Sequence, residues 1–216
     1  MEKKYKFEKT GFESYVNNDA LVVIVGVTPG NNQIEGKNEI ISPLEKKKKY
    51  AFKGEPMRSN LIKMLDLIGV NKVLGIQSCK TIWDNDFRLV EMTSLLKRGT
   101  YEIIDGKRKM FNKAKNIAGN SQLEKEFNNG FVKDCAQYQN AKLCVACGPD
   151  TYKILLDLFR QGIIRKPIVG IAHPSGQNGN WVNCYLKKKQ PNSETLKRCE
   201  ILRDDAISKI QFMTNL

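Results

Sequence analysis

The sequence predicts an α/β fold in which a mostly parallel sheet is covered by helices on both faces. Short apolar runs, rich in β-branched residues, alternate along the chain with longer segments whose apolar residues recur at helical spacing. Gly, Pro and Asn separate the two kinds of segment. Strands that alternate with helices pair in parallel, because the helix carries the chain back to the edge where the next strand starts.

The first half of the chain contains one clear strand and one clear helix. Residues 22–26, Val-Val-Ile-Val-Gly, predict a fully buried strand, because the run is short, β-branched and followed by a turn signal. A loop rich in Asn, Gly and Lys is expected from there to about Tyr50. Residues 57–70 have helical spacing and a glycine near their end, which predicts a helix. Residues 72–76 fit a short strand or an extended link.

The middle of the chain is more polar. Residues 87–96 predict a second strand, which ends in the polar Thr93 and Ser94. Residues 105–121 contain many Lys, Gly and Asn residues and are expected to form a flexible basic loop. Residues 123–140 predict a helix.

The last third of the chain repeats the strand and helix pattern. Residues 141–148 and 167–172 predict two further strands. Between them, Pro149 starts a helix at a position where proline is tolerated, and Gly162 ends it. Residues 192–216 predict a terminal helix, capped by Asn192 or Ser193. No internal repeat interrupts this order.

Size and composition predict an ordinary folded protein. A chain of 216 residues with 41% hydrophobic residues can bury the core of a single α/β domain, and we expect one domain over residues 1–216. The first 14 residues are charged and lack the apolar core of a signal peptide. No apolar run approaches the roughly 20 residues of a membrane helix. These features favour an intracellular, cytoplasmic protein.

The chain is strongly basic. Lys and Arg total 36 against 23 Asp and Glu, a formal charge of +13. This excess fits a solubilising surface, or a surface that attracts a polyanion such as nucleic acid. It is densest at residues 46–49, 105–115 and 187–189, and none of these stretches has the amphipathic pattern of a membrane-binding helix. We therefore expect no membrane partner.

The six cysteines do not have the spacing of a disulfide framework, and we expect them to be reduced. Cys144 and Cys147 form a CxxC pair inside a predicted strand, where positions three apart point to opposite faces. No second CxxC and no histidine pair completes a metal site. Packing is thus favoured over metal binding for this pair.

Two predicted strands end in unusually polar loops. The first loop, residues 26–33, reads Gly-Val-Thr-Pro-Gly-Asn-Asn-Gln, and the last loop, residues 173–180, starts with the only histidine and reads His-Pro-Ser-Gly-Gln-Asn-Gly-Asn. Ligands bind beyond the carboxyl ends of parallel strands, so Thr28, Thr93 and His173 are candidate site residues. The first loop lacks the glycines of a dinucleotide fingerprint and the Lys-Ser/Thr of a triphosphate loop. A GxSxG motif is also missing from the sequence.

The pair of motifs GVTPG (residues 26–30) and HPS (residues 173–175) resembles the uracil-DNA glycosylase superfamily. Three stretches between them also resemble that superfamily in order and approximate spacing: AFKGEPMRSNLIKML (51–65), LVEMTSLLK (89–97) and YQNAKLCVACGPDTYKILL (138–156). The resemblance covers residues 21–182. It implies a three-layer αβα sandwich with a central, mostly parallel sheet of four to five strands.

The resemblance implies a DNA glycosylase of base excision repair, which hydrolyses the N-glycosidic bond of a flipped uracil or another deaminated or damaged base. It implies that His173 stabilises the departing base and that Thr28 in the first loop places the water. Because a threonine hydroxyl cannot hold the proton of this water, Asn31, Asn32, Gln33 or Glu35 from the loop beyond is expected to assist, and Asn31 is taken as the catalytic candidate. No metal, iron–sulfur cluster or cofactor is expected, since Arg98 stands after Lys97 where cluster-binding relatives have cysteine. The implied partner is double- or single-stranded DNA.

The resemblance also implies two groups of binding residues. The expected base-binding residues are Gly26, Val27, Pro29, Gly30, Phe52, which would stack on the base, and Ser94. The expected DNA-binding residues are Ser175, Gln177, Asn178 and Trp181, where Trp181 would fill the space of the flipped base or lie in the core.

Several positions depart from the pattern of the superfamily. Val27 and Thr28 replace the residues that usually orient the water, and neither can accept its proton. Ser94 replaces an amide that reads the edge of uracil. Two other functions therefore stay open: a catalytically impaired nucleic-acid-binding relative of the same fold, and a hydrolase of small molecules or nucleotides whose positive charge is incidental.

Overall fold

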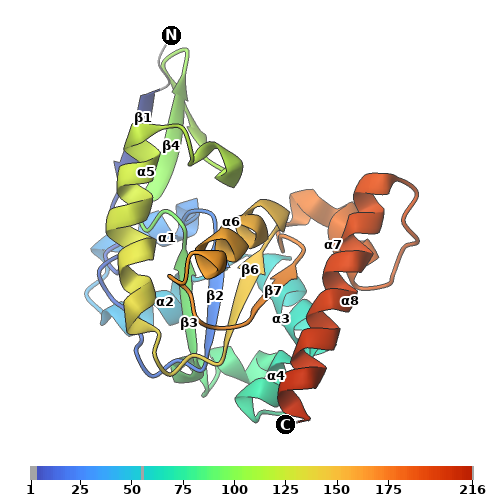
Figure 1. Cartoon of the computed structure of the whole chain (residues 1–216). Helices are drawn as coiled ribbons and strands as arrows, with labels where there is room; N and C mark the ends of the chain where they lie inside the picture. The colour runs from blue at the N-terminus through green and yellow to red at the C-terminus, as the bar shows by residue number, and fades with distance from the viewer. Residues whose placement is uncertain (1–3, 55, 216) are drawn as a thin grey trace.

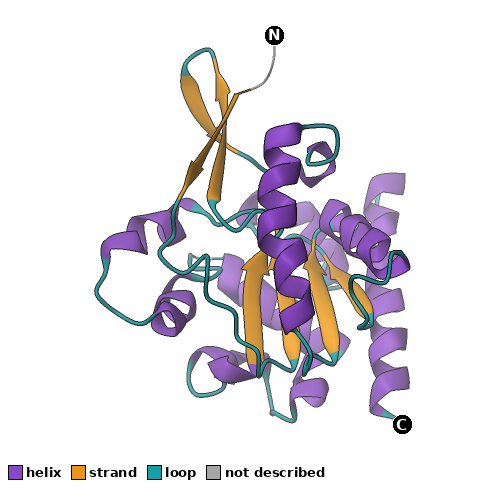
Figure 2. Cartoon of the chain, turned by 60° about the vertical axis from the view of Figure 1, so that its left-hand side comes forward, coloured by secondary structure: helices purple, strands orange, loops and turns teal. Residues whose placement is uncertain are grey.

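The computed structural model describes residues 4–54 and 56–215. Four strands form the central sheet: β2 (Val22–Gly26), β3 (Val90–Ser94), β6 (Leu143–Cys147) and β7 (Ile168–Ile171). Their order is β3-β2-β6-β7, and every neighbouring pair is parallel (Figures 1 and 2). The predicted parallel sheet is confirmed, with four strands.

Helices cover both faces of this sheet, which confirms the predicted α/β class. Alternate residues of β2 enter two separate cores, with Val22 and Ile24 on one side and Val23 and Val25 on the other. The first core contains residues of α3 (Met57–Ile68), α4 (Val70–Leu74), α7 (Gly179–Tyr185) and α8 (Glu194–Thr214). The second contains residues of α5 (Ser121–Phe127) and α6 (Pro149–Arg160).

Helix ends lie close to the predicted positions, because glycine and capping residues mark them. Gly69 has a φ of 89° and ends α3 by donating its N–H to the carbonyl oxygens of Leu65 and Asp66. The α6 helix starts at Pro149, and Gly162, two residues after its end, has a φ of 74°. At the start of α8, the Ser193 side chain accepts a hydrogen bond from the N–H of Leu196.

Cys144 and Cys147 lie on opposite faces of β6, as predicted, one in each core. All six cysteines are free. Burial raises the pKa of the Cys144 thiol to about 12, so the thiolate form is suppressed. Among residues 4–54 and 56–215, no group of three His, Cys, Asp or Glu side chains is arranged to hold a metal ion.

The segment expected to be a loop up to Tyr50 is mostly helical, so this expectation was wrong. It contains α1 (Asn31–Glu35), a 3₁₀ turn (Gly36–Asn38) and α2 (Pro43–Tyr50). Ser42 and Glu45 form a capping box at the start of α2, a signal that the high lysine content of this helix obscured.

Residues 72–76 are not a strand, because most of them belong to α4. Val70, Val73 and Leu74 of this short helix are buried in the first core. Residues 87–96 start with a 3₁₀ turn (Phe87–Leu89) before β3, and the predicted helix over 123–140 continues from α5 into a π-helical turn (Asn128–Val132). Further 3₁₀ turns lie at Cys79–Trp83, Ala114–Asn116, Cys135–Gln137 and Gly176–Asn178.

A second, antiparallel sheet was not predicted. It consists of β1 (Lys4–Glu8), β4 (Gly99–Ile104) and β5 (Lys107–Met110), in the order β1-β4-β5. We call these three strands the basic ribbon. Asp105 and Gly106 join β4 to β5 with φ values of 49° and 72°, the conformation of a type I′ hairpin turn. The expected flexible loop over 105–121 therefore starts as a strand.

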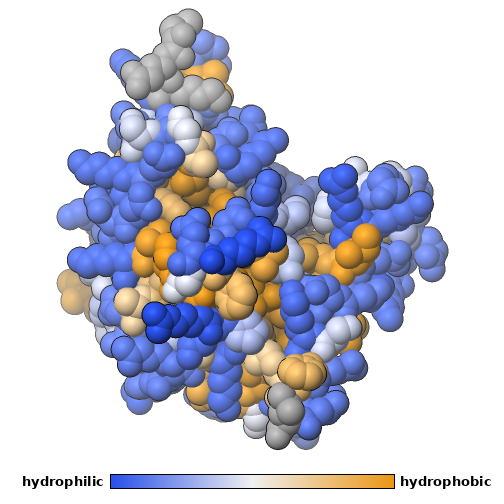
Figure 3. All heavy atoms as spheres, viewed as in Figure 1, coloured by the Kyte–Doolittle hydropathy of each residue, from blue (hydrophilic) through white to orange (hydrophobic). Residues whose placement is uncertain are grey.

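The basic ribbon projects from the molecule beyond the carboxyl ends of the central strands (Figures 1 and 2). Hydrophilic side chains cover most of the face seen in Figure 3, and hydrophobic ones show mainly in its middle. In the part of the chain that the structure describes, no helix combines the length and apolar character needed to cross a bilayer.

Candidate functional site

The candidate site lies at the carboxyl edge of the central sheet, where the first and last loops both begin. Gly26 at the end of β2 pairs with Ser94 at the end of β3, and Cys147 pairs with Ile171 at the ends of β6 and β7. Only β6 separates β2 from β7. Adjacent strands are about 4.8 Å apart, so the ends of β2 and β7 are separated by about 10 Å.

Three of the predicted base-binding residues meet at the end of β2. A Cβ atom placed on Gly26 would lie 3.7 Å from the Ser94 Oγ and 3.9 Å from the Phe52 Cζ. Phe52 has a φ of 51°, a left-handed conformation that is unfavourable for a residue with a side chain. Its ring packs partly against the first core. The backbone of Phe52 is therefore strained in the conformation that places its ring beside Gly26.

His173 is held by donors on one side of its ring. The backbone N–H of Ser175 donates to Nδ1 over 3.4 Å, and the Asn178 side-chain nitrogen lies 3.4 Å from the same atom. A backbone N–H can only donate, so Nδ1 is an acceptor and the proton of the neutral ring lies on Nε2. Among the described residues, Nε2 has no hydrogen-bond partner. Burial lowers the pKa of His173 below its ordinary value of 6.5, which keeps the ring neutral.

Lys53, which follows α2, and Asn60, which lies in the first turn of α3, connect the first loop to the last loop. The side-chain nitrogen of Asn32 donates to the carbonyl oxygen of Lys53 over 3.0 Å. Further along, the side-chain nitrogen of Asn60 donates to the carbonyl oxygen of Pro174 over 3.0 Å. Phe52 stands next to Lys53 in the sequence. Both loops and the stacking candidate are therefore tied to one stretch of chain.

Glycine also occupies the end of β6, between the two loops. Gly148 has a φ of 101°, which favours glycine strongly, and its N–H donates to the carbonyl oxygen of Ile171 over 2.8 Å. A Cβ placed there would lie 3.6 Å from the His173 Cβ. The strand ends between Ser94 and His173 thus carry no side chains at Gly26 and Gly148. Gly148 belongs to the stretch 138–156 that resembles the superfamily, but it was not among the predicted site residues.

Thr28 does not present a free hydroxyl. Its Oγ1 donates to the carbonyl oxygen of Arg98 over 3.0 Å and accepts from the N–H of Thr100 over 3.0 Å. The hydroxyl proton is therefore engaged, and one lone pair remains for a water. The observed role of Thr28 is to fasten the first loop to β4, which the sequence alone did not indicate.

The other candidates of the first loop differ in their surroundings. The Oδ1 of Asn31 accepts a hydrogen bond from the Tyr101 hydroxyl over 2.9 Å, and Asn31 is otherwise exposed. Gly30 is exposed and donates its N–H to the side chain of Gln33. Val27 packs partly against the second core.

Pro29 lines a small cavity beneath the first loop. The cavity has a volume of about 10 Å³, which is close to the space that one water molecule needs. It is also lined by polar side chains, among them Gln33, Lys47, Thr93, Ser94 and Lys97.

The predicted DNA-binding residues lie in and after the last loop. Gln177 is exposed, and Asn178 donates to the Ser175 Oγ over 2.9 Å as well as facing His173. Trp181 is partly buried and packs against the first core. Of the two places considered for Trp181, the structure thus shows the one against the core.

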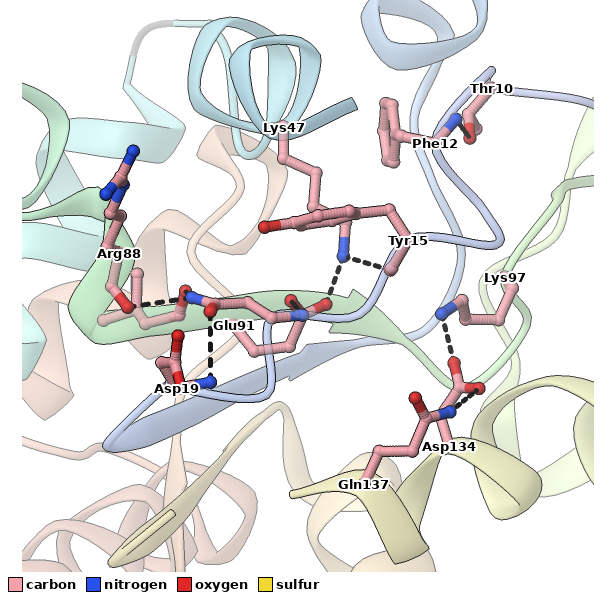
Figure 4. A network of polar contacts seen from close by, with 12 residues as sticks. Thr10, Phe12, Tyr15, Asp19, Lys47, Arg88, Glu91, Lys97, Asp134 and Gln137 are labelled. Carbon is pink, nitrogen blue, oxygen red and sulfur yellow. Dashed lines mark hydrogen bonds and ion pairs between the residues drawn. The ribbon is translucent and has the colours of Figure 1, made fainter. Parts of the chain in front are cut away.

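Buried ion pairs support the edge of the sheet below the site (Figure 4). Lys47 of α2 pairs with Glu91 of β3, and both side chains are almost completely buried. Glu91 also accepts from the N–H of Asn17, and Lys47 donates to the carbonyl oxygen of Tyr15. This network joins α2 and the N-terminal segment to β3. A second pair joins Lys97 to Asp134.

No protein-family model matches the chain. Among curated proteins it is 27% identical over 210 residues to YoxB of Bacillus subtilis (strain 168), an uncharacterized protein, over 90% of this chain and 80% of YoxB. Among solved structures it is similar to wild-type SMUG2 of Pedobacter heparinus. That similarity has a TM-score of 0.49 and 17% identity, over 95% of this chain and 81% of the other. These similarities alone assign no activity to the chain.

Proposed function

We propose that the chain is a DNA glycosylase that hydrolyses the N-glycosidic bond of a flipped, deaminated or damaged base. One observation carries this proposal: His173 is neutral and has an Nε2–H without a partner among the described residues, at the same sheet edge as Phe52 and Ser94. The base would lie above the side-chain-free strand ends at Gly26 and Gly148.

His173 stabilises the departing base in this proposal. Breaking the N-glycosidic bond leaves negative charge on the base, where a carbonyl oxygen carries much of it. The Nε2–H of His173 donates to that oxygen, and the Ser175 N–H holds the ring in the required tautomer. One preorganised donor of this kind accelerates a reaction by roughly 10²- to 10³-fold.

Phe52 and Ser94 bind the base before the bond breaks. The Phe52 ring stacks on the face of the base, an interaction that every base can make. The Ser94 hydroxyl can either donate or accept a hydrogen bond, so it discriminates less between base edges than an amide with fixed donors and acceptors. We therefore expect the enzyme to accept more than one altered base.

The water attacks after the base has begun to leave. Neither Thr28 nor Asn31 can accept a proton, so the site has no general base in the first loop. An oxocarbenium-like sugar is electrophilic enough to be attacked by a neutral water. The water oxygen bonds to C1′, and its surplus proton passes to the departed base anion. Thr28 and Asn31 need only position this water, through the remaining lone pair of Thr28 and the side-chain nitrogen of Asn31.

The engaged hydroxyl of Thr28 favours one alternative function, a nucleic-acid-binding protein without catalysis.

A single experiment separates the alternatives. Duplex and single-stranded oligonucleotides carrying uracil, hypoxanthine, xanthine or a thymine mismatch are incubated with the protein, and abasic sites are cleaved with alkali. Release of any of these bases supports the glycosylase. Tight binding without release supports the binding protein, and no binding at any salt concentration favours a small-molecule hydrolase.

A further inference from the structure

Direct contacts join the basic ribbon to the first loop. The Thr28 hydroxyl bridges the carbonyl oxygen of Arg98 and the N–H of Thr100 at the start of β4. Ile34 of α1 packs so closely on Gly99 that a Cβ there would lie 2.2 Å from its Cδ1. These contacts therefore fix the position of the ribbon relative to the first loop.

A chain of contacts links the far end of the ribbon to the site. The guanidinium of Arg108 in β5 lies 4.3 Å from the centre of the Tyr101 ring in β4. The Tyr101 hydroxyl donates to the Oδ1 of Asn31, one residue after the first-loop motif GVTPG. These contacts stiffen the ribbon at its attachment to the site.

The outer part of the ribbon carries exposed basic side chains on both faces. Lys107, Arg108 and Lys109 are all exposed. In the strand register, Lys107 stands opposite Ile104 and Lys109 opposite Glu102, whereas Arg108 stands opposite Ile103. Lys107 and Lys109 therefore share one face of the ribbon, and Arg108 lies on the other.

The ion pairs of the ribbon that the structure describes involve Arg108 and Lys6 but neither Lys107 nor Lys109. Glu8 pairs with Arg108 and with Lys6. The ammonium groups of Lys107 and Lys109 make no ion pair with residues 4–54 or 56–215. Strong basic groups that protrude from a sheet beside a site are suited to the phosphates of a nucleic acid.

We propose that the basic ribbon is a second DNA contact, in which Lys107 and Lys109 bind backbone phosphates of the duplex on one side of the flipped base. This inference rests on the proposed function. The six residues of β4 span about 20 Å, which corresponds to about six phosphates of one DNA strand along the helix axis. The proposed ribbon contact therefore reaches the duplex on only one flank of the target base.

The test compares two double variants of equal charge. Lys107→Gln/Lys109→Gln removes the proposed contacts. Lys72→Gln/Lys142→Gln removes two exposed lysines that lie in α4 and directly before β6, towards the opposite end of the sheet. Binding to a duplex with a central uracil is measured by fluorescence anisotropy over a salt series, and flank length is then shortened on each side in turn.

We expect the ribbon variant to bind at least about tenfold more weakly at 0.1 M salt than the control variant. The slope of log K against log salt should fall by about 1.8, because each lost phosphate contact contributes about 0.9. Shortening one flank should weaken the control variant and leave the ribbon variant unchanged. Lys107→Arg/Lys109→Arg should restore binding, which separates loss of charge from misfolding.

Equal affinities, slopes and flank dependence for both glutamine variants would overturn the inference. If the wild-type protein releases bases and the two variants are indistinguishable, only the role of the ribbon is wrong. If the wild-type protein binds no DNA at any salt concentration, the proposed function and the role of the ribbon are both wrong.

Discussion

The backbone N–H of Ser175 donates to Nδ1 of His173, two residues earlier in the same loop, over 3.4 Å. This hydrogen bond makes Nδ1 an acceptor and so places the ring proton on Nε2. It also opposes protonation of the ring, because a protonated Nδ1 would face a donor. Burial acts in the same direction by lowering the pKa of His173.

The tautomer of His173 can be measured directly, because the chain has no other histidine. We expect ¹⁵N-resolved NMR at neutral pH to show a neutral ring with the proton on Nε2. Replacing Asn178 by Asp places a carboxylate near Nδ1 and should raise the pKa of His173 and draw a proton to Nδ1. Asn178→Ala, in which the Ser175 donor remains, serves as the control and should keep the Nε2 tautomer. A wild-type ring protonated on Nδ1 would contradict the assigned geometry.

The pH dependence of stability follows from the same lowered pKa. As the pH is lowered, His173 of the unfolded chain binds a proton near the ordinary pKa of 6.5. His173 of the folded chain, whose pKa is lower, binds its proton only at a lower pH. The unfolded state therefore binds more protons below that pH, and the free energy of unfolding falls as the pH is lowered. Urea unfolding of the wild type and of His173→Gln should show this loss only in the wild type. If the difference in free energy of unfolding between the wild type and His173→Gln stays constant from pH 7.5 to 5.5, this prediction is wrong.

The strained backbone of Phe52 predicts an unusual order of stabilities. At most positions a glycine variant is less stable than an alanine variant. At Phe52, where φ is 51°, glycine relieves the left-handed strain, so Phe52→Gly should be more stable than Phe52→Ala by roughly 1 kcal/mol. Phe87, a buried residue without positive φ, is the matched control and should show the usual order. The measurement is the free energy of unfolding in urea.

The buried pair of Lys47 and Glu91 predicts a large cost when one partner is lost. Glu91→Gln should destabilise the fold by about 3–5 kcal/mol, because an unpaired ammonium stays buried. Lys47→Met/Glu91→Leu should recover much of this loss, since it removes both charges. Lys49→Gln, which breaks the exposed pair with Glu39, should change the free energy of unfolding little. A double variant as unstable as the single one would argue against this account.

Much of the fold could be predicted because its buried parts are apolar in a regular pattern. The strands at residues 22–26 and 143–147 are short apolar runs, and β7 lies within a third such run. The basic ribbon was missed because β5 is mostly exposed and basic and therefore lacks the apolar alternation of a strand. Its signal was the Asp105-Gly106 turn between β4 and β5, which resembled a flexible loop in composition. The α2 helix was missed because Lys46 and Lys47 are buried, which lysine rarely is.

The candidate site was predicted less completely than the fold. Sequence motifs indicated Gly26, Phe52 and Ser94, and the structure brings these three together. The partners of Thr28, Arg98 directly before β4 and Thr100 within it, lie about 70 residues further along the chain, and a local pattern cannot reveal such contacts. The same holds for Asn60, which binds the last loop from 114 residues away.

The most direct test of the central claim is the rate of base release under single-turnover conditions, with the protein in excess over a labelled duplex that carries an accepted base. We expect His173→Gln to release the base about 10²- to 10³-fold more slowly than the wild type, with an unchanged dissociation constant for the duplex. Undiminished release by His173→Gln, or no release by the wild type from any altered base, would contradict the account.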